Sequence, residues 1–177
     1  GERDWTLLVQ AVDLWVPEVA DILDRFSFLP RWRIDDIMVS YATDGGSVGP
    51  HYDNYDVFLL QGSGQRRWSV GGLCDDNSAL LPHSNLRILA EQQFSEEWTL
   101  NCGDMLYLPP RYSHHGVSIG ECTTFSIGFR APTVTEILDD LTTELISQNK
   151  LLDVLADPAL TPDMASDSIP SAYADQI

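Results

Sequence analysis

Apolar residues follow a helical spacing at both ends of the chain and a strand-like pattern between them. Near the N-terminus, residues 5–12 have the apolar period of a helix. A second helix is predicted to begin at Pro17, a favourable first-turn residue, and to end at Pro30. A third helix is predicted after Pro132. The apolar faces of these helices consist of Trp5, Leu8, Val9 and Val12; of Val19, Ile22, Leu23 and Phe26; and of Val134, Ile137, Leu138, Leu141 and Leu145.

The middle of the chain predicts short strands separated by glycine- and proline-containing turns. Gly62-Ser63-Gly64 is typical of a tight turn between two strands, and the polar stretch 72–95 indicates a loop-rich insertion. Helices, then short strands, then a helix favour a mainly β protein, a closed or nearly closed barrel with flanking helices. The expected strands are 34–41, 57–60, 66–70, 98–100, 105–108, 114–117 and 123–130.

The composition is that of one globular core, because 177 residues with 44% hydrophobic content are enough to bury one. We expect this core, with two N-terminal helices, over residues 1–132, and a helix with an acidic, proline-containing tail over 133–177. No apolar run is long enough to span a membrane, and no signal peptide opens the chain. Because it begins with Gly1 and not Met, we expect a piece of a longer protein.

Charge and cysteine content narrow the classes of partner and compartment. A net charge of −17 disfavours direct nucleic-acid binding, because phosphate contacts require cations, and it favours a basic partner. Solubility or an acid-rich proteome explains the same charge equally well. The three cysteines lack a Cys-x-x-Cys pair, which disfavours a disulfide framework or a zinc knuckle and favours a reducing cytoplasm.

The segment His51-Tyr52-Asp53 and the distant His114 have the residue types of an iron(II) oxygenase centre. In an extended segment, residues i and i+2 point to the same face, so His51 and Asp53 could hold one ion together. Three ligands on one side of an octahedron leave positions open for a cosubstrate and oxygen. The His-x-Asp triplet alone is a weak signal, because such triplets also occur by chance.

The strand expected after this segment carries a candidate anion-binding residue. Alternation places Arg66 on the face of Trp68 and Val70, where a buried guanidinium would need an anionic partner such as a dicarboxylate. The alternative is that Arg66 and Arg67 both lie on the surface and only Trp68 is buried. Residue types alone favour this alternative.

With these residues in view, the chain resembles the bacterial JmjC-type ribosomal oxygenases, cupin-superfamily proteins that include ribosomal-protein arginine hydroxylases. The resemblance extends from about Trp5 to about Thr135 and is far more specific than His-x-Asp. It rests on Trp5-Thr6-Leu7-Leu8-Val9-Gln10-Ala11-Val12, Trp32-Arg33-Ile34-Asp35-Asp36, Val48-Gly49-Pro50-His51, Tyr55-Asp56-Val57-Phe58 and Gly128-Phe129-Arg130-Ala131-Pro132.

The resemblance implies a double-stranded β-helix, the JmjC form of the jelly-roll or cupin fold, that holds iron(II) and 2-oxoglutarate. Iron would be bound by His51, Asp53 and His114, and the far carboxylate of 2-oxoglutarate by Arg66. His115 would then face away or support the ligands, since neighbours on a strand point oppositely. The remaining expected residues are Ser40, Thr124 and Ser126 for 2-oxoglutarate, Tyr52, Asn54 and Tyr55 for a peptide side chain, and His83 as a surface residue in the polar loop.

The implied activity is hydroxylation of an arginine side chain of a large-subunit ribosomal protein. The same resemblance implies a homodimer at full length, with residues 133–177 as the start of the dimerisation region. One alternative is the same chemistry on a histidine or another residue of a basic protein. The other is a non-enzymatic, cupin-like binding domain, in which Arg66→Ala would leave 2-oxoglutarate affinity unchanged.

Overall fold

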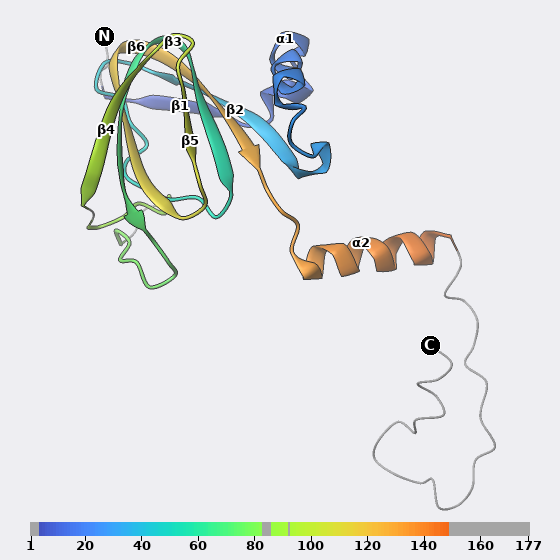
Figure 1. Ribbon diagram of the computed structural model, residues 1–177. Helices are drawn as coiled ribbons and strands as arrows, with labels where there is room; N and C mark the ends of the chain where they lie inside the picture. The colour runs from blue at the N-terminus through green and yellow to red at the C-terminus, as the bar shows by residue number, and fades with distance from the viewer. Residues whose placement is uncertain (1–3, 83–85, 92, 149–177) are drawn as a thin grey trace, which may run out of the picture. The chain divides into compact units, whose positions relative to one another are not determined.

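The computed structural model describes residues 4–82, 86–91 and 93–148, and within them strands dominate (Figure 1). Short helical turns follow the first strand, and one longer helix follows the last. The strands are β1 (Thr6–Val9), β2 (Ile34–Ala42), β3 (Asp56–Leu73), β4 (Phe94–Asn101), β5 (Met105–Leu108) and β6 (Tyr112–Phe129). The helices are η1 (Val12–Leu14), α1 (Pro17–Ala20), η2 (Asp21–Phe26), η3 (Arg31–Arg33) and α2 (Val134–Ser147).

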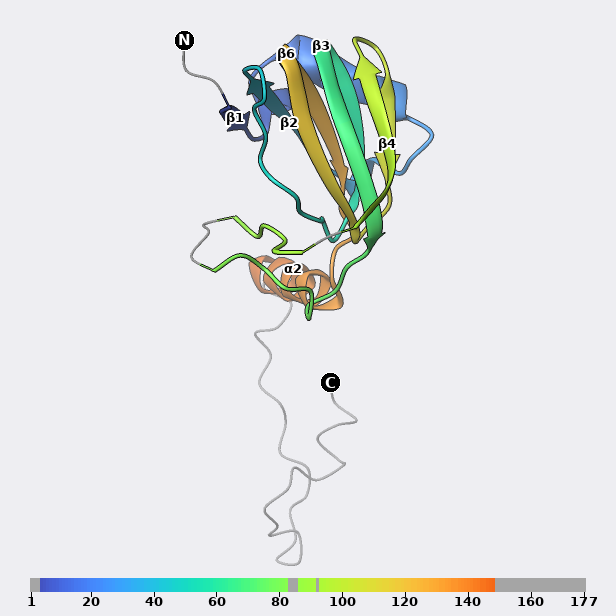
Figure 2. The same cartoon turned by 90° about the vertical axis from the view of Figure 1, so that its left-hand side faces the viewer.

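Two long strands, β3 and β6, organise the sheet. They pair antiparallel over most of their length, from Asp56 opposite Phe129 to Leu73 opposite Tyr112. The first part of β3 also pairs with β5 and its second part with β4, while β2 and then β1 follow on the other side of β6. Figure 2 shows β6, β3 and β4 as neighbours. All these pairs are antiparallel, as expected for a mainly β jelly-roll or cupin-type fold, and that expectation is confirmed.

Alternation along β3 separates two apolar cores. One side of β3 contributes Val57, Leu59, Trp68 and Val70 to the core inside the barrel, which Leu100 and Leu108 complete. The opposite side contributes Phe58 and Leu60 to a second core that also contains α1 and η2 residues and the outer side of β2 and β6. The helical turns therefore cover one outer face of the sheet and leave the barrel interior to the residues of the site.

The helix expected over residues 5–12 is wrong, because Thr6–Val9 forms strand β1. Its backbone pairs with β2, with Leu8 opposite Ser40, and its residues alternate between half-buried and exposed. An apolar spacing over so few residues fits the period of a helix and that of a strand. The free edge of β2, with which this segment pairs, favours the strand. The second expected helix exists only as the short α1 followed by the 3-10 turn η2.

The tight turn expected between two strands is also wrong. Gly62-Ser63-Gly64 lies inside the continuous strand β3, where register shifts on both sides of Ser63 bend the strand without reversing it. Gly64 has φ +63° and approaches Glu121 so closely that an added Cβ would lie 2.1 Å from that residue's carbonyl oxygen. In the same way, the two strands expected over 114–117 and 123–130 are parts of β6.

The third expected helix is confirmed as α2, which belongs to a separate compact unit that begins at Pro132. Thr133 caps it: its hydroxyl accepts from the Glu136 N–H at 3.2 Å, and the Glu136 carboxylate accepts from the Thr133 N–H at 2.7 Å. Within the part of the chain that the structure describes, no helix has the length and hydropathy to cross a membrane. The expected tail after residue 156, and His83, lie outside the described residues.

Candidate metal centre

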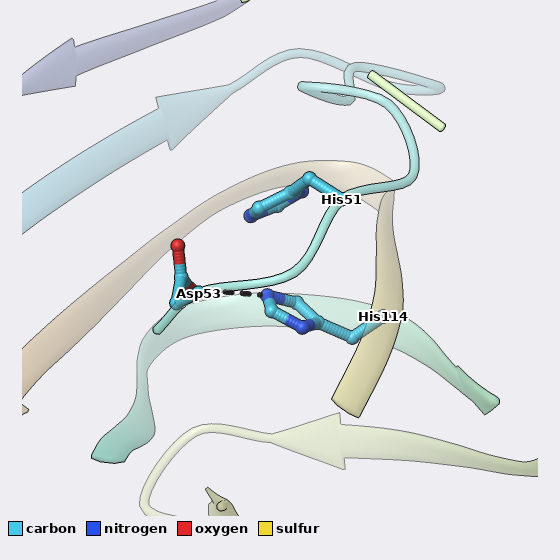
Figure 3. A group of neighbouring side chains, drawn as sticks. All are labelled: His51, Asp53 and His114. Carbon is cyan, nitrogen blue, oxygen red and sulfur yellow. Dashed lines mark ion pairs between the residues drawn. The ribbon is translucent and has the colours of Figure 1, made fainter. Parts of the chain in front are cut away.

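The structure brings His51, Asp53 and His114 together (Figure 3). His51 and His114 are joined as an antiparallel bridge: the His51 N–H donates to the His114 carbonyl at 3.0 Å, and the His114 N–H donates to the His51 carbonyl at 2.8 Å. Asp53 lies two residues after His51, with its Oδ2 3.6 Å from His114 Nε2. One ligand atom from each residue lies within 4.8 Å of the others, a separation that one cation can bridge.

Backbone contacts fix which nitrogen of each imidazole is free to bind a metal. Nδ1 of His51 lies 2.9 Å from the Gly49 carbonyl oxygen, and Nδ1 of His114 lies 3.0 Å from the Tyr112 carbonyl oxygen. A carbonyl only accepts, so each Nδ1 carries the proton and each Nε2 keeps its lone pair. These are the contacts that orient metal-binding histidines in proteins.

Burial sets the protonation of the group. The His114 side chain is almost fully buried, and this burial, with a smaller contribution from nearby His51, lowers the pKa of His114 to about 3. Its imidazole is therefore neutral near pH 7 and available as a ligand. Burial also raises the pKa of the Asp53 carboxyl above its ordinary value. A bound cation would offset the cost of keeping this carboxylate charged in a buried site.

The three residues lie in a cavity of about 200 Å³ inside the barrel. Its walls are mostly apolar, and Arg66 is the cationic residue among them. The cavity is lined by His51, Asp53 and His114 together with Leu8, Gln10, Met38, Ser40, Val48, Tyr55, Val57, Leu59, Arg66, Trp68, Leu86 and Ser126.

The sequence left open whether Arg66 is buried or lies on the surface with Arg67, and the structure shows that it is buried. Its side chain is only 3% exposed, whereas Arg67 faces outward and is 49% exposed. Among the described residues, Arg66 Nε and Nη2 have no hydrogen-bond partner, and its guanidinium carbon lies 5.7 Å from the centre of the Trp68 ring. A buried cation without an anionic partner is costly, so the chemistry of this site favours an anionic ligand.

The other expected site residues fall into two groups. Ser40, Ser126 and Tyr55 line the cavity, in keeping with their expected places. Thr124, Tyr52 and Asn54 are not among the lining residues. The buried Thr124 hydroxyl donates to Gln61 Oε1 at 3.1 Å, Asn54 is exposed, and the Tyr52 hydroxyl donates to the Asp75 carbonyl at 2.9 Å. His115 is outside the metal-binding group and its ring stacks on Phe94.

Several cavity residues were not singled out from the sequence. Leu8 and Gln10 were missed because their segment was expected to be helical, although the strand pairing places Leu8 opposite Ser40. Leu86 belongs to the polar insertion, where no periodic signal exists. Met38 had a usable signal, because it lies two residues before Ser40 and so on the same face of a strand.

Comparison with known proteins agrees with this geometry. The family model described as "JmjC domain" matches residues 21–137. A probable ribosomal oxygenase of Haemophilus influenzae is 46% identical over 138 residues, which cover 77% of this chain and 34% of the relative. The Escherichia coli ribosomal protein uL16 3-hydroxylase is 38% identical over 162 residues, covering 92% of this chain and 43% of the relative.

Solved structures show the same likeness. The crystal structure of E. coli ycfD has a TM-score of 0.83 at 36% identity and covers 99% of this chain and 47% of its own. A structure of the same ribosomal oxygenase with cobalt and 2-oxoglutarate has a TM-score of 0.79 at 35% identity, covering 99% of this chain and 45% of its own. The chain thus spans less than half the length of these relatives. Because the family model matches more than half of the chain, the chain belongs to the JmjC domain family.

Proposed function

We propose that this chain is the catalytic part of an iron(II)- and 2-oxoglutarate-dependent oxygenase that hydroxylates an arginine side chain of a ribosomal protein. One observation carries the proposal: a cavity holds three metal-ligating atoms and also a buried arginine whose Nε and Nη2 have no partner among the described residues. The ligand set fits iron(II), and the arginine fits the far carboxylate of a dicarboxylic acid. The relative solved with cobalt and 2-oxoglutarate supports both assignments.

Each residue has a separate task in the proposed reaction. Nε2 of His51, Nε2 of His114 and the Asp53 carboxylate would hold the metal. Arg66 binds and orients 2-oxoglutarate through a charge-assisted pair, and Ser40 and Ser126 offer hydroxyls on the same wall. Thr124 supports this wall through its bond to Gln61. When bound, iron and 2-oxoglutarate supply the oxidation itself, in which oxygen is consumed and succinate and carbon dioxide leave.

The apolar walls exclude water from the reaction. Val57, Leu59 and Trp68 belong to the packed inner core and also line the cavity. Their side chains give the site a low dielectric constant, which strengthens the contact between Arg66 and a carboxylate. The same packing prevents competing reactions with solvent.

The charge near the cavity supports a cationic substrate. Burial, and after it the negative charges of Asp53, Asp35 and Asp36, raise the pKa of Tyr55 to about 12. Asp35 and Asp36 lie in a bulge of β2, just before the cavity residue Met38. These carboxylates lie close enough to the cavity residue Tyr55 to favour a cationic side chain beside it, as the net charge of −17 favours a basic protein. The name of the uL16 3-hydroxylase points to a ribosomal protein.

Histidine is the second candidate for the target residue. A Dictyostelium discoideum relative named as a lysine-specific demethylase and histidyl-hydroxylase is 31% identical and covers 68% of this chain. The carboxylates of Asp35 and Asp36 near Tyr55 favour arginine over neutral histidine. A location in the cytoplasm and a homodimer at full length remain predictions.

Succinate release and peptide mass test the proposal together. The protein is incubated with iron(II), ascorbate, 2-oxoglutarate and matched basic ribosomal peptides that contain arginine, lysine or histidine at the target position. We expect peptide-stimulated succinate and a gain of one oxygen on the arginine peptide. Oxidation of the histidine peptide alone would show that the target residue is histidine and not arginine. Binding of 2-oxoglutarate without turnover of any peptide would favour a non-enzymatic binding domain.

A further inference from the structure

Tyr52 lies between two metal-binding residues but points away from the metal. Its ring is 9% exposed and does not line the cavity, whereas His51 and Asp53 on either side of it do. This is the geometry of an extended segment, in which every second side chain faces the same way. The Tyr52 side chain therefore has a role that the metal-binding group does not explain.

The Tyr52 hydroxyl joins two segments on the outer side of the metal-binding residues. It donates to the Asp75 carbonyl at 2.9 Å and accepts from Arg87 Nη2 at 3.1 Å. The Arg87 guanidinium carbon also lies 5.7 Å from the centre of the Tyr52 ring, a cation–π contact. One phenol thus satisfies both its donor and its acceptor within the protein.

The segment Leu86–Leu89, here called the wall segment, is held against the metal-binding segment at further points. The Leu89 N–H donates to the Pro50 carbonyl at 2.8 Å. The Ile88 side chain lies 3.2 Å from the place where a Cβ at Gly49 would stand, and Ile88 is buried. The wall segment therefore has a fixed end at Ile88–Leu89, next to the residue that precedes His51.

The other end of the wall segment reaches the cavity. Leu86 lines the cavity that contains the three metal-binding residues, and its side chain is half exposed to solvent. Arg87, the next residue, is the one that contacts Tyr52. The Leu86 carbonyl accepts from the Ile88 N–H at 2.9 Å, and the bond between Arg87 and Tyr52 fixes the residue that joins Leu86 to Ile88.

We propose that Tyr52 is a positioning residue for the protein substrate: through Arg87 it holds Leu86 at the cavity entrance, at a fixed distance from the metal. This inference rests on the proposed function, because it assigns Leu86 to the wall that a substrate side chain passes. Tyr52 would thereby affect where the substrate binds and leave metal and 2-oxoglutarate binding unchanged.

The kinetic test compares Tyr52→Phe with Tyr107→Phe. Tyr52→Phe keeps the ring and removes the hydroxyl, and Tyr107→Phe removes a hydroxyl that bonds to Asp56 at 2.7 Å, outside the cavity lining. Loss of the two Tyr52 hydrogen bonds should raise the KM for the peptide about three- to tenfold, with more succinate formed per hydroxylated peptide. The KM for 2-oxoglutarate and the affinity for Mn(II) should stay within about twofold of wild type. Tyr107→Phe should behave as wild type.

A double variant tests whether Tyr52 acts through Leu86. Leu86→Ala should raise the peptide KM by itself, because it removes the wall side chain. If Tyr52 acts only by placing Leu86, then Tyr52→Phe should add little in the Leu86→Ala background. Fully additive effects would contradict the proposed connection.

A distance measurement tests the inference without turnover. Bound Mn(II) broadens the NMR signals of nearby methyl groups, so the Leu86 methyl signals, assigned by their loss in Leu86→Ala, report the distance of Leu86 from the metal. We expect strong broadening in wild type and in Tyr107→Phe, and weaker broadening in Tyr52→Phe.

Two outcomes would overturn the inference. One is that Tyr52→Phe and wild type show equal broadening and an equal peptide KM. The other is that Tyr52→Phe loses as much Mn(II) affinity as His51→Ala. A wild-type protein that binds Mn(II) but oxidises no peptide would contradict the proposed function, and the methyl signals would still decide the role of Tyr52.

Discussion

At the scale of single residues, the site depends on the side of its strand on which each side chain lies. Arg66 and Arg67 are neighbours of the same type, yet one is buried beside Trp68 and the other is exposed. His114 and His115 differ in the same way: His114 lies in the metal-binding group, and His115 stacks on Phe94. The chain therefore contains matched pairs that separate a role in the site from a change of residue type.

Replacement of Arg66 should weaken 2-oxoglutarate binding selectively. Arg66→Gln removes the buried charge that is expected to pair with the far carboxylate, so the KM for 2-oxoglutarate should rise about 30-fold or more. Arg67→Gln, at the exposed neighbour, should change it less than about twofold. Steady-state succinate release at varied 2-oxoglutarate gives both values. An unchanged KM in Arg66→Gln would remove Arg66 from the proposed site.

Metal addition should stabilise the wild-type protein and not the ligand variants. A ligand at about 100 times its Kd stabilises the folded state by about 2.7 kcal/mol, so Mn(II) should raise the Tm of the chelator-treated protein by roughly 5–10 °C. His51→Ala and Asp53→Ala should fold without metal but lose most of this shift. His115→Ala should retain it. Thermal scans by circular dichroism measure the shift, and a full shift in His51→Ala would refute the metal assignment.

At the scale of elements, two strands are longer than their sequences suggest, because glycine bends them in place of ending them. β3 continues through Gly62 and Gly64, and β6 continues through Gly120, which has φ +70°. The pairing of β3 with β6 on both sides of these bends places the metal-binding end of β6 beside Val70 and the cavity wall at Leu59 beside Ser126. The bends thus help to bring the residues that line the cavity together.

Substitution of Gly64 should destabilise the barrel. An alanine there would hold a positive φ and bring its Cβ to 2.1 Å from the Glu121 carbonyl oxygen, which no flexible side chain can relieve. We expect a loss of about 1–3 kcal/mol in the free energy of unfolding. Gly72→Ala is the control, since an added Cβ at Gly72 meets nothing within 4 Å, and should change stability by less than about 0.5 kcal/mol. Urea unfolding of both variants gives the difference, and equal stabilities would contradict the close approach.

At the scale of the whole molecule, the acidic charge affects association with a partner more than it affects the fold. The 27 acidic residues exceed the basic ones by 17, and the resulting field attracts a basic protein over a distance that salt shortens. The buried Arg66 is shielded from this screening, since ions in solution do not reach it.

Salt should therefore affect the two substrates differently. Between about 0.05 M and about 0.3 M NaCl, the KM for a basic peptide should rise about threefold or more, while kcat stays nearly constant. The KM for 2-oxoglutarate should change less, because its anchor is buried. A neutral variant of the peptide serves as the control. A peptide KM that does not respond to salt would show that the acidity serves solubility alone.

The sequence by itself determined the chemistry of the site and most of the elements that carry it. His51-x-Asp53 in an extended segment, the alternation of Arg66, Trp68 and Val70, and the helix capped by Thr133 follow from local periodicity, which the folded structure preserves. These features need only the geometry of one strand or one helix. The order of the elements favoured a mainly β barrel, and the residue types of His51, Asp53 and His114 indicated a metal site. Family resemblance specified the jelly-roll form of the barrel.

Tertiary structure alone decided the rest. Strand β1 exists because β2 offers a free edge, which no pattern within residues 5–12 reveals. Arg66 is buried because its side chain lies in the cavity inside the barrel, whereas residue type alone favoured the surface. Arg87 meets the Tyr52 hydroxyl and Leu86 lines the cavity, although both belong to a polar loop whose sequence has no periodicity. The physical reason is common to all three: pairing and burial between distant segments exceed local preferences in free energy, and the sequence does not state which segments meet.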